Sequence, residues 1–386
     1  MNVPFLDLKI QYQSIKNEID PAIQEVLNNA AFVLGDAVSD FENEFRAAHN
    51  LLHCFGVSSG TAGNHLALWA LGVGQGDEVI VPVNTFIATA WGATLCGAIP
   101  VFVDCCIDSY TIDPARVEEQ ITHRTKAIVA VHLYGQSADM DPLRDIARRH
   151  HVYLVEDCAQ AHIAEYKGHR VGGLSDASSF SFYPGKNLGA YGEAGAVATN
   201  DQSLARKFKS MRDHGSANKY FHEMPGHNYR MEGIQGAVLG VKLKHLAAWT
   251  DARRRIARTY NDHLAGLPQV VTPCEMPYAK HVYHLYVIRT SQRDILKEYL
   301  QTKGISTGLH YPIPLHLQQV FSELGYKEGR FPVAEQVSRE VLSLPMYPEL
   351  TEEQIKYVCD AIRDFFHERH VSNNPIASAA PIVTVA

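Results

Sequence analysis

Several features that often reveal a protein's class are absent from this sequence of 386 residues. Its cysteines are odd in number, dispersed along the chain and without any CxxC spacing, so the sequence indicates neither a disulfide framework nor a zinc site, and no metal ligands are expected. Reduced thiols of this kind favour a cytoplasmic protein. The seven cysteines are Cys54, Cys96, Cys105, Cys106, Cys158, Cys274 and Cys359.

The chain also lacks the segments by which proteins contact membranes and nucleic acids. No uncharged apolar run approaches the roughly 18 residues of a membrane span. Residues 1–10 contain no basic region followed by an apolar core, so we expect no signal peptide. The net charge is −7, and the longest basic run, residues 253–255, lies on an expected helix face. We therefore expect neither a nucleic-acid nor a membrane partner.

What is present is an alternation of short apolar strands with helices. A chain of this length accommodates one large domain of roughly 250 residues and a smaller one of about 100. Uniformly apolar strands separated by helices indicate an α/β fold, with a mostly parallel sheet covered on both faces. Such sheets bind ligands beyond the carboxyl ends of their strands. The expected strands are 78–81, 101–103, 127–131 and 152–155, and the expected helices among them are 65–71, 85–97 and 142–150.

One lysine differs from the others in its surroundings. Lys186 lies between a hydroxyl-rich run at 178–181 and a glycine-rich turn, and no acidic residue lies within six positions of it. Its aromatic and small neighbours suggest the wall of a pocket. A lysine that is removed from water can lose its proton near neutral pH and attack an aldehyde. An aldehyde cofactor would therefore suit this position.

A second stretch, Val-Ser-Ser-Gly-Thr at 57–61, precedes the apolar helix expected at 65–71. A strand, a Ser/Gly/Thr turn and a helix amino terminus together form a cradle for an anion, because free N–H groups and the helix dipole point at the same place. Phosphate would suit this cradle. Simple capping of the helix by Ser59 or Thr61 explains the same residues equally well.

Asp157 follows the strand expected at 152–155, where an unpaired carboxylate would be costly. A pyridinium nitrogen would be a suitable partner, although capping of the next helix explains Asp157 alone. Together, Lys186, Asp157 and the cradle at 59–61 meet three requirements of pyridoxal 5′-phosphate: a lysine for the aldehyde, an acid for the ring nitrogen and a phosphate site. Phe86 offers a ring that could stack on the pyridine.

At this point the chain resembles the DegT/DnrJ/EryC1/StrS family of sugar aminotransferases over nearly its whole length. The resemblance rests on motifs such as Val-Glu-Asp-Cys-Ala-Gln-Ala-His at 155–162 and Ser-Phe-Tyr-Pro-Gly-Lys-Asn-Leu-Gly at 181–189. The other matching segments are 4–8, 57–61, 82–89, 228–231, 310–314 and 342–348. The resemblance implies an aspartate-aminotransferase-like fold, fold type I, with a seven-stranded sheet and a smaller C-terminal α+β domain.

The resemblance also implies roles for individual residues. Lys186 would hold the cofactor aldehyde and Asp157 the ring nitrogen, with pyridoxamine 5′-phosphate as the other cofactor form. The further residues implied at the cofactor are Gln160 near the phenolic oxygen, Phe86 on the ring face, and Gly60, Thr61 and Ser181 on the phosphate. Asn228 and Arg230 would reach the phosphate from a second subunit, which implies a homodimer with shared active sites.

The implied reaction transfers an amino group from L-glutamate to a nucleotide-linked keto-sugar. The sequence of residues 183–190 resembles that of the family branch that acts on 3-keto sugars, including dTDP-3-keto-6-deoxyhexoses. Two segments depart from the common family pattern: Ala-His-Ile-Ala at 161–164 in place of Ala-His-Gly-Ala, and Gly-Glu-Ala-Gly at 192–195 in place of Gly-Asp-Gly-Gly. Neither departure removes a catalytic group, so both bear on substrate shape.

Residues 1–248 are expected to form the amino-terminal arm and the large domain, 249–370 the small domain, and 371–386 a flexible or partner-covering tail. Separate helices are expected at 231–246 and 250–264, and a strand at 283–288. Candidate substrate contacts are Tyr183, His310, Tyr311 and His316, and His284 could join them. Packed or surface histidines are the more common outcome at such positions.

Three alternatives remain open. The protein could aminate another carbonyl, such as a 4-keto sugar, a UDP-linked 3-keto sugar or a sugar aldehyde. Some relatives dehydrate sugars with histidine in place of the lysine, and Lys186 argues against that chemistry. A cofactor-binding regulatory protein would normally carry an attached basic DNA-binding segment, for which neither terminus has the length or charge.

Overall fold

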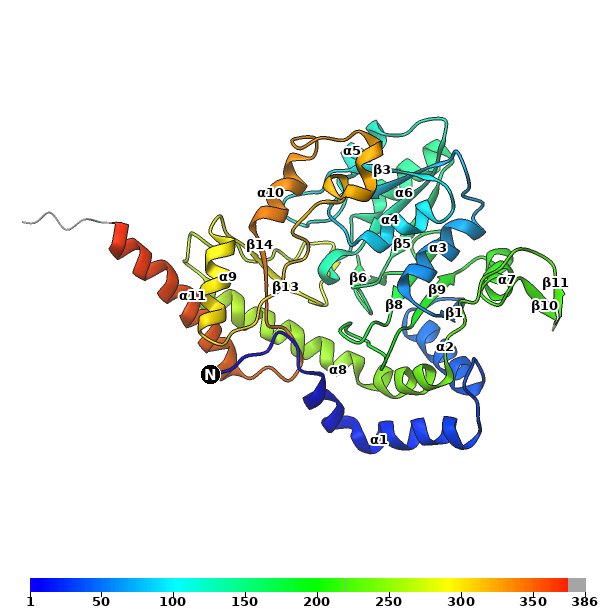
Figure 1. The fold of residues 1–386 in the computed structure, drawn as a ribbon, viewed down its shortest axis with the longest axis horizontal. Coiled ribbons are helices and arrows are strands. Elements are labelled where there is room, and N and C mark those ends of the chain that lie inside the picture. Colours follow the sequence, from blue (N-terminus) through cyan, green and yellow to red (C-terminus); the bar gives the residue numbers. More distant parts are fainter. Residues whose placement is uncertain (219, 374–386) are drawn as a thin grey trace, which may run out of the picture.

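The computed structural model of this protein describes residues 1–218 and 220–373, and its centre is a seven-stranded sheet (Figure 1). The strand order is β1-β9-β8-β5-β4-β2-β3. Of these seven strands, β9 alone runs opposite to the other six, so the predicted α/β fold with a mostly parallel sheet is confirmed. The strands are β1 (His53–Val57), β2 (Glu78–Pro82), β3 (Ile99–Val103), β4 (Thr125–Val131), β5 (Tyr153–Asp157), β8 (Ala177–Ser181) and β9 (Gly195–Thr199).

Helices cover both faces of this sheet, because successive strand side chains point to opposite sides. Val79 and Val81 of β2 pack in one apolar cluster, whereas Ile80, between them, packs in another. The helices on the first face are α3 (Gly60–Ala70), α4 (Ile87–Thr94) and α7 (Gln202–Met211). Those on the second face are α5 (Pro114–Glu119), α6 (Met140–His150) and, at the other end of the sheet, α2 (Asp36–Ala48). The strands are therefore buried on both faces, which explains their uniformly apolar sequences.

A single long helix, α8 (Gly233–Leu264), connects the sheet region to the C-terminal region. The prediction of two helices with a break near 247–249 is therefore wrong. The residues at the expected break are Ala247, Ala248 and Trp249, none of which interrupts helical hydrogen bonding. The amphipathic pattern changes there because the helix leaves one set of packing partners and meets another, as Leu246 and Ile256 belong to different apolar clusters.

Two buried cations on α8 fasten it to loops on either side. Lys242 donates a hydrogen bond from Nζ to the carbonyl of Gly189, at 2.7 Å. Three turns further on, a single Nη1 of Arg253 lies within hydrogen-bond distance of the carbonyls of Tyr283, His284 and Met346. Both side chains are almost fully buried. One rigid helix therefore contacts both the loop that follows β8 and the segments of the C-terminal region.

The C-terminal region forms an apolar cluster of its own around a two-stranded antiparallel sheet. The predicted strand at 283–288 begins later than expected, because Tyr283 has a left-handed backbone (φ 44°) that a strand cannot accommodate. The elements are β13 (Tyr286–Arg289), β14 (Val341–Leu344), α9 (Arg293–Thr302), α10 (Pro332–Glu340), α11 (Glu352–Asn373) and the short 3-10 helices η2 (Leu315–Leu317) and η3 (Gln319–Leu324).

The amino-terminal arm crosses from the C-terminal region to the sheet region. Val3 pairs with Ile305, and Asp7 caps helix α1 (Leu8–Asn28), which lies beside α8 (Figure 1). The remaining elements are small. They are η1 (Leu133–Gly135), a three-stranded sheet of β6 (Glu165–Tyr166), β7 (His169–Arg170) and β12 (Ala279–Lys280), and a hairpin of β10 (Ser216–Asn218) and β11 (Phe221–His222).

The predicted domain boundaries can be placed on these elements. Residue 248 lies inside α8, so the boundary proposed there falls within a continuous helix. The predicted tail begins inside α11, and its residues 374–386 lie outside the described residues. Within the described part of the chain, no helix is long and apolar enough to cross a membrane.

We predict that Gly195→Ala destabilises the fold by about 1–3 kcal/mol, because the start of β9 passes very close to the start of α3. A Cβ atom at Gly195 would lie 2.4 Å from the backbone of Ser59. Urea unfolding measures the change. Gly240→Ala in α8 is the matched control, since nothing lies within 4 Å of a Cβ there. We expect the control to be neutral or to stabilise by about 0.5–1 kcal/mol. Equal effects of the two substitutions would contradict the prediction.

Candidate active site

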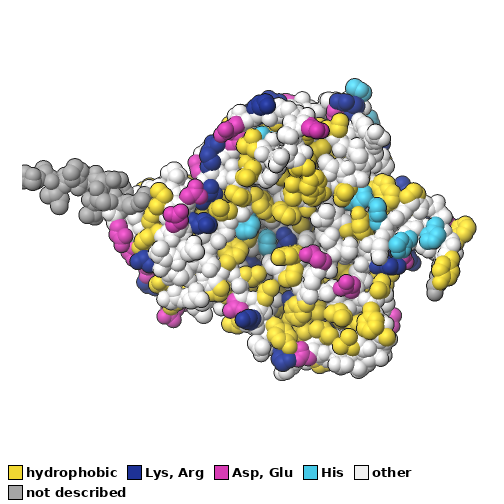
Figure 2. All heavy atoms as spheres, viewed as in Figure 1, with side chains coloured by type: hydrophobic (Ala, Val, Ile, Leu, Met, Phe, Trp, Pro, Cys, Tyr) yellow, Lys and Arg dark blue, Asp and Glu magenta, His cyan; other side chains and the backbone are white. Residues whose placement is uncertain are grey.

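A cavity of about 590 Å³ opens at the carboxyl ends of the central strands, between the sheet and the C-terminal region. Figure 2 shows hydrophobic and histidine side chains gathered near the centre of the face seen in Figure 1. The sequence-predicted residues that line the cavity are Gly60, Thr61, Phe86, Asp157, Gln160, Ser181, Tyr183, Lys186, His310 and Tyr311. The fold thus brings together side chains that lie as much as 250 positions apart along the chain.

Lys186 lies on the loop between β8 and β9. Its backbone N–H donates to the carbonyl of Tyr183 at 2.8 Å, which closes a tight turn. The turn continues to Gly189, where a Cβ atom would lie 2.2 Å from the carbonyl oxygen of Pro184. Burial lowers the pKa of the Lys186 amine to about 8, and the nearby carboxylate of Asp157 opposes part of this change. About a tenth of this amine is therefore uncharged at pH 7, compared with less than a thousandth for a fully hydrated lysine.

Neutral imidazoles surround this amine. Burial, together with the positive charge of Lys186, lowers the pKa of His310 to about 4. The same two causes hold the pKa of His284 well below its usual range. Both rings line the cavity, and His284 faces the amide oxygen of Asn187 at 3.3 Å from its Nδ1 atom. Neither histidine adds a positive charge to the cavity at neutral pH.

Asp157 is the last residue of β5, and its carboxylate is buried at the floor of the cavity. Oδ2 accepts hydrogen bonds from Asn64 Nδ2 at 2.9 Å and from Thr89 Oγ1 at 2.8 Å. Oδ1 accepts one from the backbone N–H of Ala159 at 3.1 Å. These donors fix the orientation of the carboxylate, and Oδ1 keeps acceptor capacity for a further donor, such as a protonated ring nitrogen.

Gln160 has a defined orientation. Its Oε1 accepts the backbone N–H of Tyr134 at 2.6 Å, so its Nε2 faces the hydroxyl of Tyr311 at 3.1 Å. An amide Nε2 carries two N–H groups, and one of them remains to donate into the cavity. This geometry suits an acceptor oxygen on a bound ring.

The predicted anion cradle is the amino terminus of α3. Ser59 caps the helix by accepting the N–H of Ala62 at 3.1 Å, so the capping interpretation is confirmed. Capping leaves the first N–H groups of the helix, on Gly60 and Thr61, without helical partners. A Cβ atom at Gly60 would lie 2.7 Å from the Cβ of Ser181, so only glycine allows the two segments to meet. This cradle, Lys186 and Asp157 together suit pyridoxal phosphate.

Two aromatic side chains lie at the opening of the cavity. Phe86 and Tyr183 are about half exposed although both line it. The ring of Phe86 lies 5.5 Å from that of Tyr311, tilted by 36°. An exposed aromatic ring above a cavity can cover a flat ligand.

Three predicted site residues do not reach the cavity of their own chain. Asn228 is exposed, and Arg230 forms an ion pair with Asp213 at 2.8 Å. His316 is buried elsewhere, with its Nε2 3.0 Å from Oε1 of Glu335. The C-terminal segment turns away from the cavity after Tyr311 and directs His316 towards α10.

Other cavity residues were not singled out by the sequence. Asn64 could have been found, because it lies one helical turn after Gly60 and Thr61 and therefore on the same side of α3. Phe5 stacks on His310 with ring centroids 5.8 Å apart, a contact between distant segments that no local pattern reveals. The remaining such residues are Leu6, Thr85, Ala88, Thr89, Val131, Ala159, Gly185, Glu193, Leu285 and Met346.

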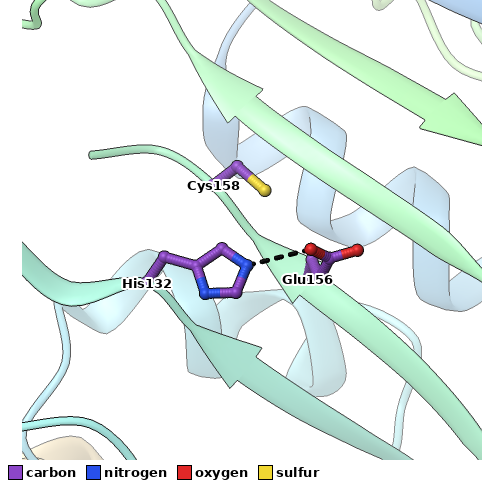
Figure 3. Close-up of side chains that lie close together, drawn as sticks. All are labelled: His132, Glu156 and Cys158. Atoms are coloured by element: carbon purple, nitrogen blue, oxygen red, sulfur yellow. Dashed lines mark hydrogen bonds and ion pairs between the residues drawn. The ribbon is translucent and has the colours of Figure 1, made fainter. Parts of the chain in front are cut away.

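Behind the cavity, His132, Glu156 and Cys158 lie close enough to one another to suggest a metal site (Figure 3). The polar atoms of His132 and Glu156 already have hydrogen-bond partners. Nε2 of His132 lies 3.0 Å from Glu156 Oε1, and Nδ1 of His132 accepts the N–H of Ala138. Glu156 also accepts hydrogen bonds from the N–H groups of Gly172 and Leu174 and from the Ser175 hydroxyl. This network ties β4 and β5 to the loop before β8.

The chain matches the DegT/DnrJ/EryC1/StrS aminotransferase family over residues 13–363. A protein of Geobacillus stearothermophilus named pleiotropic regulatory protein is 49% identical over 95% of this chain and 99% of its own length. The dTDP-3-amino-3,4,6-trideoxy-alpha-D-glucose transaminase of Streptomyces venezuelae is 46% identical over 94% of this chain and 96% of its own.

Solved structures agree with this match. DesV of S. venezuelae, solved in complex with a ketimine intermediate, superimposes with a TM-score of 0.93 at 46% identity, covering 94% of this chain and 98% of its own. NtdA of Bacillus subtilis, solved with bound cofactor PMP, superimposes with a TM-score of 0.89 at 31% identity, covering 95% and 85%. The predicted aminotransferase fold is confirmed by these neighbours.

We predict that Lys186→Met stabilises the cofactor-free protein by about 2 kcal/mol at pH 7, because it removes an amine that is costly to charge when buried. The pKa of this amine is 10.5 when it is fully hydrated and about 8 in the fold. Below pH 8 the folded protein bears the full cost of charging the amine. That cost falls as the pH rises through the folded pKa, and it is gone above the unfolded value. The gain should therefore shrink between pH 8 and 10.5.

Urea unfolding at several pH values measures this gain. Lys244→Met, at an exposed position on α8, is the control and should change stability by less than about 0.5 kcal/mol. A gain that is independent of pH, or a loss of stability at pH 7, would contradict the burial of a partly neutral amine.

Proposed function

This chain belongs to the DegT/DnrJ/EryC1/StrS aminotransferase family, and we propose that it transfers an amino group from L-glutamate to a dTDP-linked 3-keto-6-deoxyhexose. It is a sugar aminotransferase. The observation that carries the proposed amino transfer is the convergence of Lys186, Asp157 and the amino terminus of α3 on one cavity. The lowered pKa of Lys186 adds the protonation state that the chemistry needs.

In this proposal the cavity holds pyridoxal phosphate. When bound, the cofactor supplies an aldehyde that exchanges amines and a ring that takes up electrons from the donor carbon. Gly60 and Thr61 would bind its phosphate through their N–H groups, and Ser181 through its hydroxyl. Asp157 would hold a proton on the ring nitrogen. Gln160 would donate its remaining N–H to the phenolic oxygen, and Phe86 would cover the ring.

Lys186 has a second task in the proposal. When its amine is not bound to the cofactor, Lys186 would act as an acid–base group, since a pKa of about 8 lets it accept a proton near neutral pH and return it. His284 and His310 are neutral in this range and do not repel the ammonium form. The same amine would serve both halves of the reaction, taking a proton from the donor carbon and later delivering one to the sugar carbon.

The charges of the cavity support the proposal of a shared site. Glutamate, the cofactor phosphate and a nucleotide diphosphate are all anions, yet Lys186 is the only lysine or arginine among the described residues that line the cavity. Asp157 and Glu193 add negative charge. We therefore infer that Asn228 and Arg230 of a second copy complete the site in a homodimer.

Exposed apolar residues near that segment support the same assembly. Tyr220 and Phe221, at the β10–β11 hairpin, are 85% and 61% exposed. Figure 2 shows hydrophobic side chains at the outer end of this hairpin, where it projects from the molecule. Such side chains are unfavourable in water, and a subunit interface would bury them.

The choice of substrate follows the transaminase of S. venezuelae, whose name specifies a dTDP-linked 3-amino sugar. A 4-keto sugar, a UDP-linked 3-keto sugar and a sugar aldehyde are the alternative substrates. The name of the Geobacillus relative favours one further candidate, a regulatory protein that binds the cofactor without turnover. Covalent labelling of the lysine and turnover on a panel of sugars separate these possibilities.

We predict that sodium borohydride fixes pyridoxal phosphate covalently to Lys186, as mapped by mass spectrometry of peptides. Lys242 is an internal control, because burial also lowers its pKa to about 8 but it lies outside the cavity. Label on Lys242 alone, or no label, would contradict the proposal.

With glutamate and a panel of nucleotide ketosugars, the wild-type protein should form an amino sugar. Lys186→Ala should lower this rate about a thousandfold or more. Labelling without turnover on any sugar would favour the regulatory candidate.

The shared site is tested by mixing two inactive variants, Lys186→Ala and Arg230→Ala. In a hybrid dimer, one site combines the intact Lys186 of one subunit with the intact Arg230 of the other. Random exchange of subunits should therefore restore about a quarter of the wild-type activity. If Arg230 instead serves its own chain, no site in the hybrid is complete and the mixture stays as inactive as its parts.

A further inference from the structure

We propose that Asn64 is a positioning residue that fixes the ionised carboxylate of Asp157 towards the cofactor ring. The inference rests on the proposed cofactor function and assigns to Asn64 a role that neither the sequence motifs nor the family match supplies. Asn64 does not need to touch the reacting atoms. It acts through Asp157, and so its effects can be separated from those of the catalytic residues.

The side chain of Asn64 lies between three elements. It projects from α3, is 3% exposed, and donates from Nδ2 to Asp157 Oδ2 on β5 at 2.9 Å. Its Oδ1 accepts a hydrogen bond from the hydroxyl of Ser179 on β8. Helix α4 approaches from the other side, and a Cβ atom at Gly92 would lie 3.1 Å from the Cβ of Asn64. The amide is therefore held in place on several sides.

The orientation of the amide follows from its partners. A carboxylate can only accept hydrogen bonds, so the group that faces Asp157 must be the NH₂ of Asn64. The opposite group is then the oxygen, which matches the donating hydroxyl of Ser179. A reversed amide would place two oxygens against each other in a buried site, which is costly. Ser179 thus keeps Asn64 turned with its donors towards Asp157.

This orientation has consequences for Asp157. Asn64 and Thr89 together supply two hydrogen-bond donors to Oδ2. Because Oδ2 is occupied in this way, the free acceptor capacity lies on Oδ1, whose other donor is the N–H of Ala159. The amide of Asn64 also neither gains nor loses a proton near neutral pH, so it cannot compete with the ring nitrogen for a proton. An acid or a histidine at position 64 could.

The alternative is that Asn64 only holds α3, α4 and the sheet together. A purely structural residue would change stability without changing how tightly the cofactor binds or whether its ring nitrogen is protonated. Asn84 provides the matched comparison: it is also buried, its Nδ2 donates to the carbonyl of Tyr110 at 2.8 Å, and it does not line the cavity.

The test uses the full chain with four variants: Asn64→Leu, Ser179→Ala, the double variant of these, and Asn84→Leu. Cofactor-free protein is titrated with pyridoxal phosphate to give Kd by fluorescence, and the loaded protein is examined with ¹⁵N-labelled cofactor, whose ring-nitrogen chemical shift reports protonation. Asn64→Leu should raise Kd about tenfold to a hundredfold, the usual cost of losing a hydrogen bond to a charged group. The ring-nitrogen signal should move towards the unprotonated value.

Ser179→Ala should change both readouts in the same direction but less, because the Ser179 hydroxyl is hydrogen-bonded to Asn64 and not to the Asp157 carboxylate, while the backbone pairing of Ser179 with Asp157 is unaffected by the substitution. In the double variant it should add nothing further, since the residue through which it acts is gone. Asn84→Leu should leave both readouts at their wild-type values. If Asn64→Leu does not fold, Asn64→Ser takes its place, because serine is too short to join Ser179 to Asp157.

Three results would overturn the inference: unchanged Kd and ring-nitrogen shift in a folded Asn64 variant, equal losses in Asn84→Leu, or additive effects of the two single substitutions. Failure of the proposed function has a different signature. In that case the wild-type protein itself would not bind pyridoxal phosphate at Lys186, whereas failure of the present inference leaves wild-type binding intact.

Discussion

The rest of the site depends on a poorly hydrated amine held near a buried carboxylate. Lys186 is partly uncharged near neutral pH because the protein removes water from it, and Asp157 limits how far its pKa falls. Neither group would be stable alone in this position. Asp157 is accepted because three donors surround it, and Lys186 because its loop opens into a cavity of about 590 Å³. The sheet brings both groups to one edge, since β5 and β8 are parallel neighbours that end on the same side.

Much of this arrangement could be predicted from local sequence. Uniformly apolar strands indicate a doubly covered sheet, and a lysine without acidic neighbours indicates a pocket, because both signals lie within a few positions. The predictions that were wrong or missing concern features that depend on contacts between residues far apart in the sequence. The expected break in α8 was a change of packing partner, which leaves no mark on backbone propensity. His316 lies beside motif residues in the chain but faces Glu335, because the direction of a side chain after a turn depends on tertiary packing. Phe5 reaches the cavity through a contact between distant segments, whereas Asn64 could have been found from its place one helical turn after Gly60.

The charges of the cavity suggest which groups of the site one chain supplies and which would come from a second subunit. One chain supplies the acid, the amine and the helix terminus, but its cavity lining carries more acidic groups than lysines or arginines among the described residues. A site that is to receive several anions needs cations from elsewhere. In the proposed homodimer, Arg230 would leave its role beside Asp213, or extend beyond it, to act in the neighbouring cavity. Catalysis would then require the assembly of two subunits.

Helix α8 gives the molecule a mechanical property. At 1.5 Å per residue, its 32 residues form a strut about 48 Å long. Lys242 fastens this strut to the carbonyl of Gly189, in the loop that carries Lys186, and Arg253 fastens it to the backbone at His284 and Met346 on the opposite wall. Both walls of the cavity are thus attached to the same helix, which opposes a hinge motion of one wall relative to the other. We therefore expect side chains at the rim to control the admission of a bulky nucleotide sugar, and the distance between the walls to limit the size of the sugar that binds.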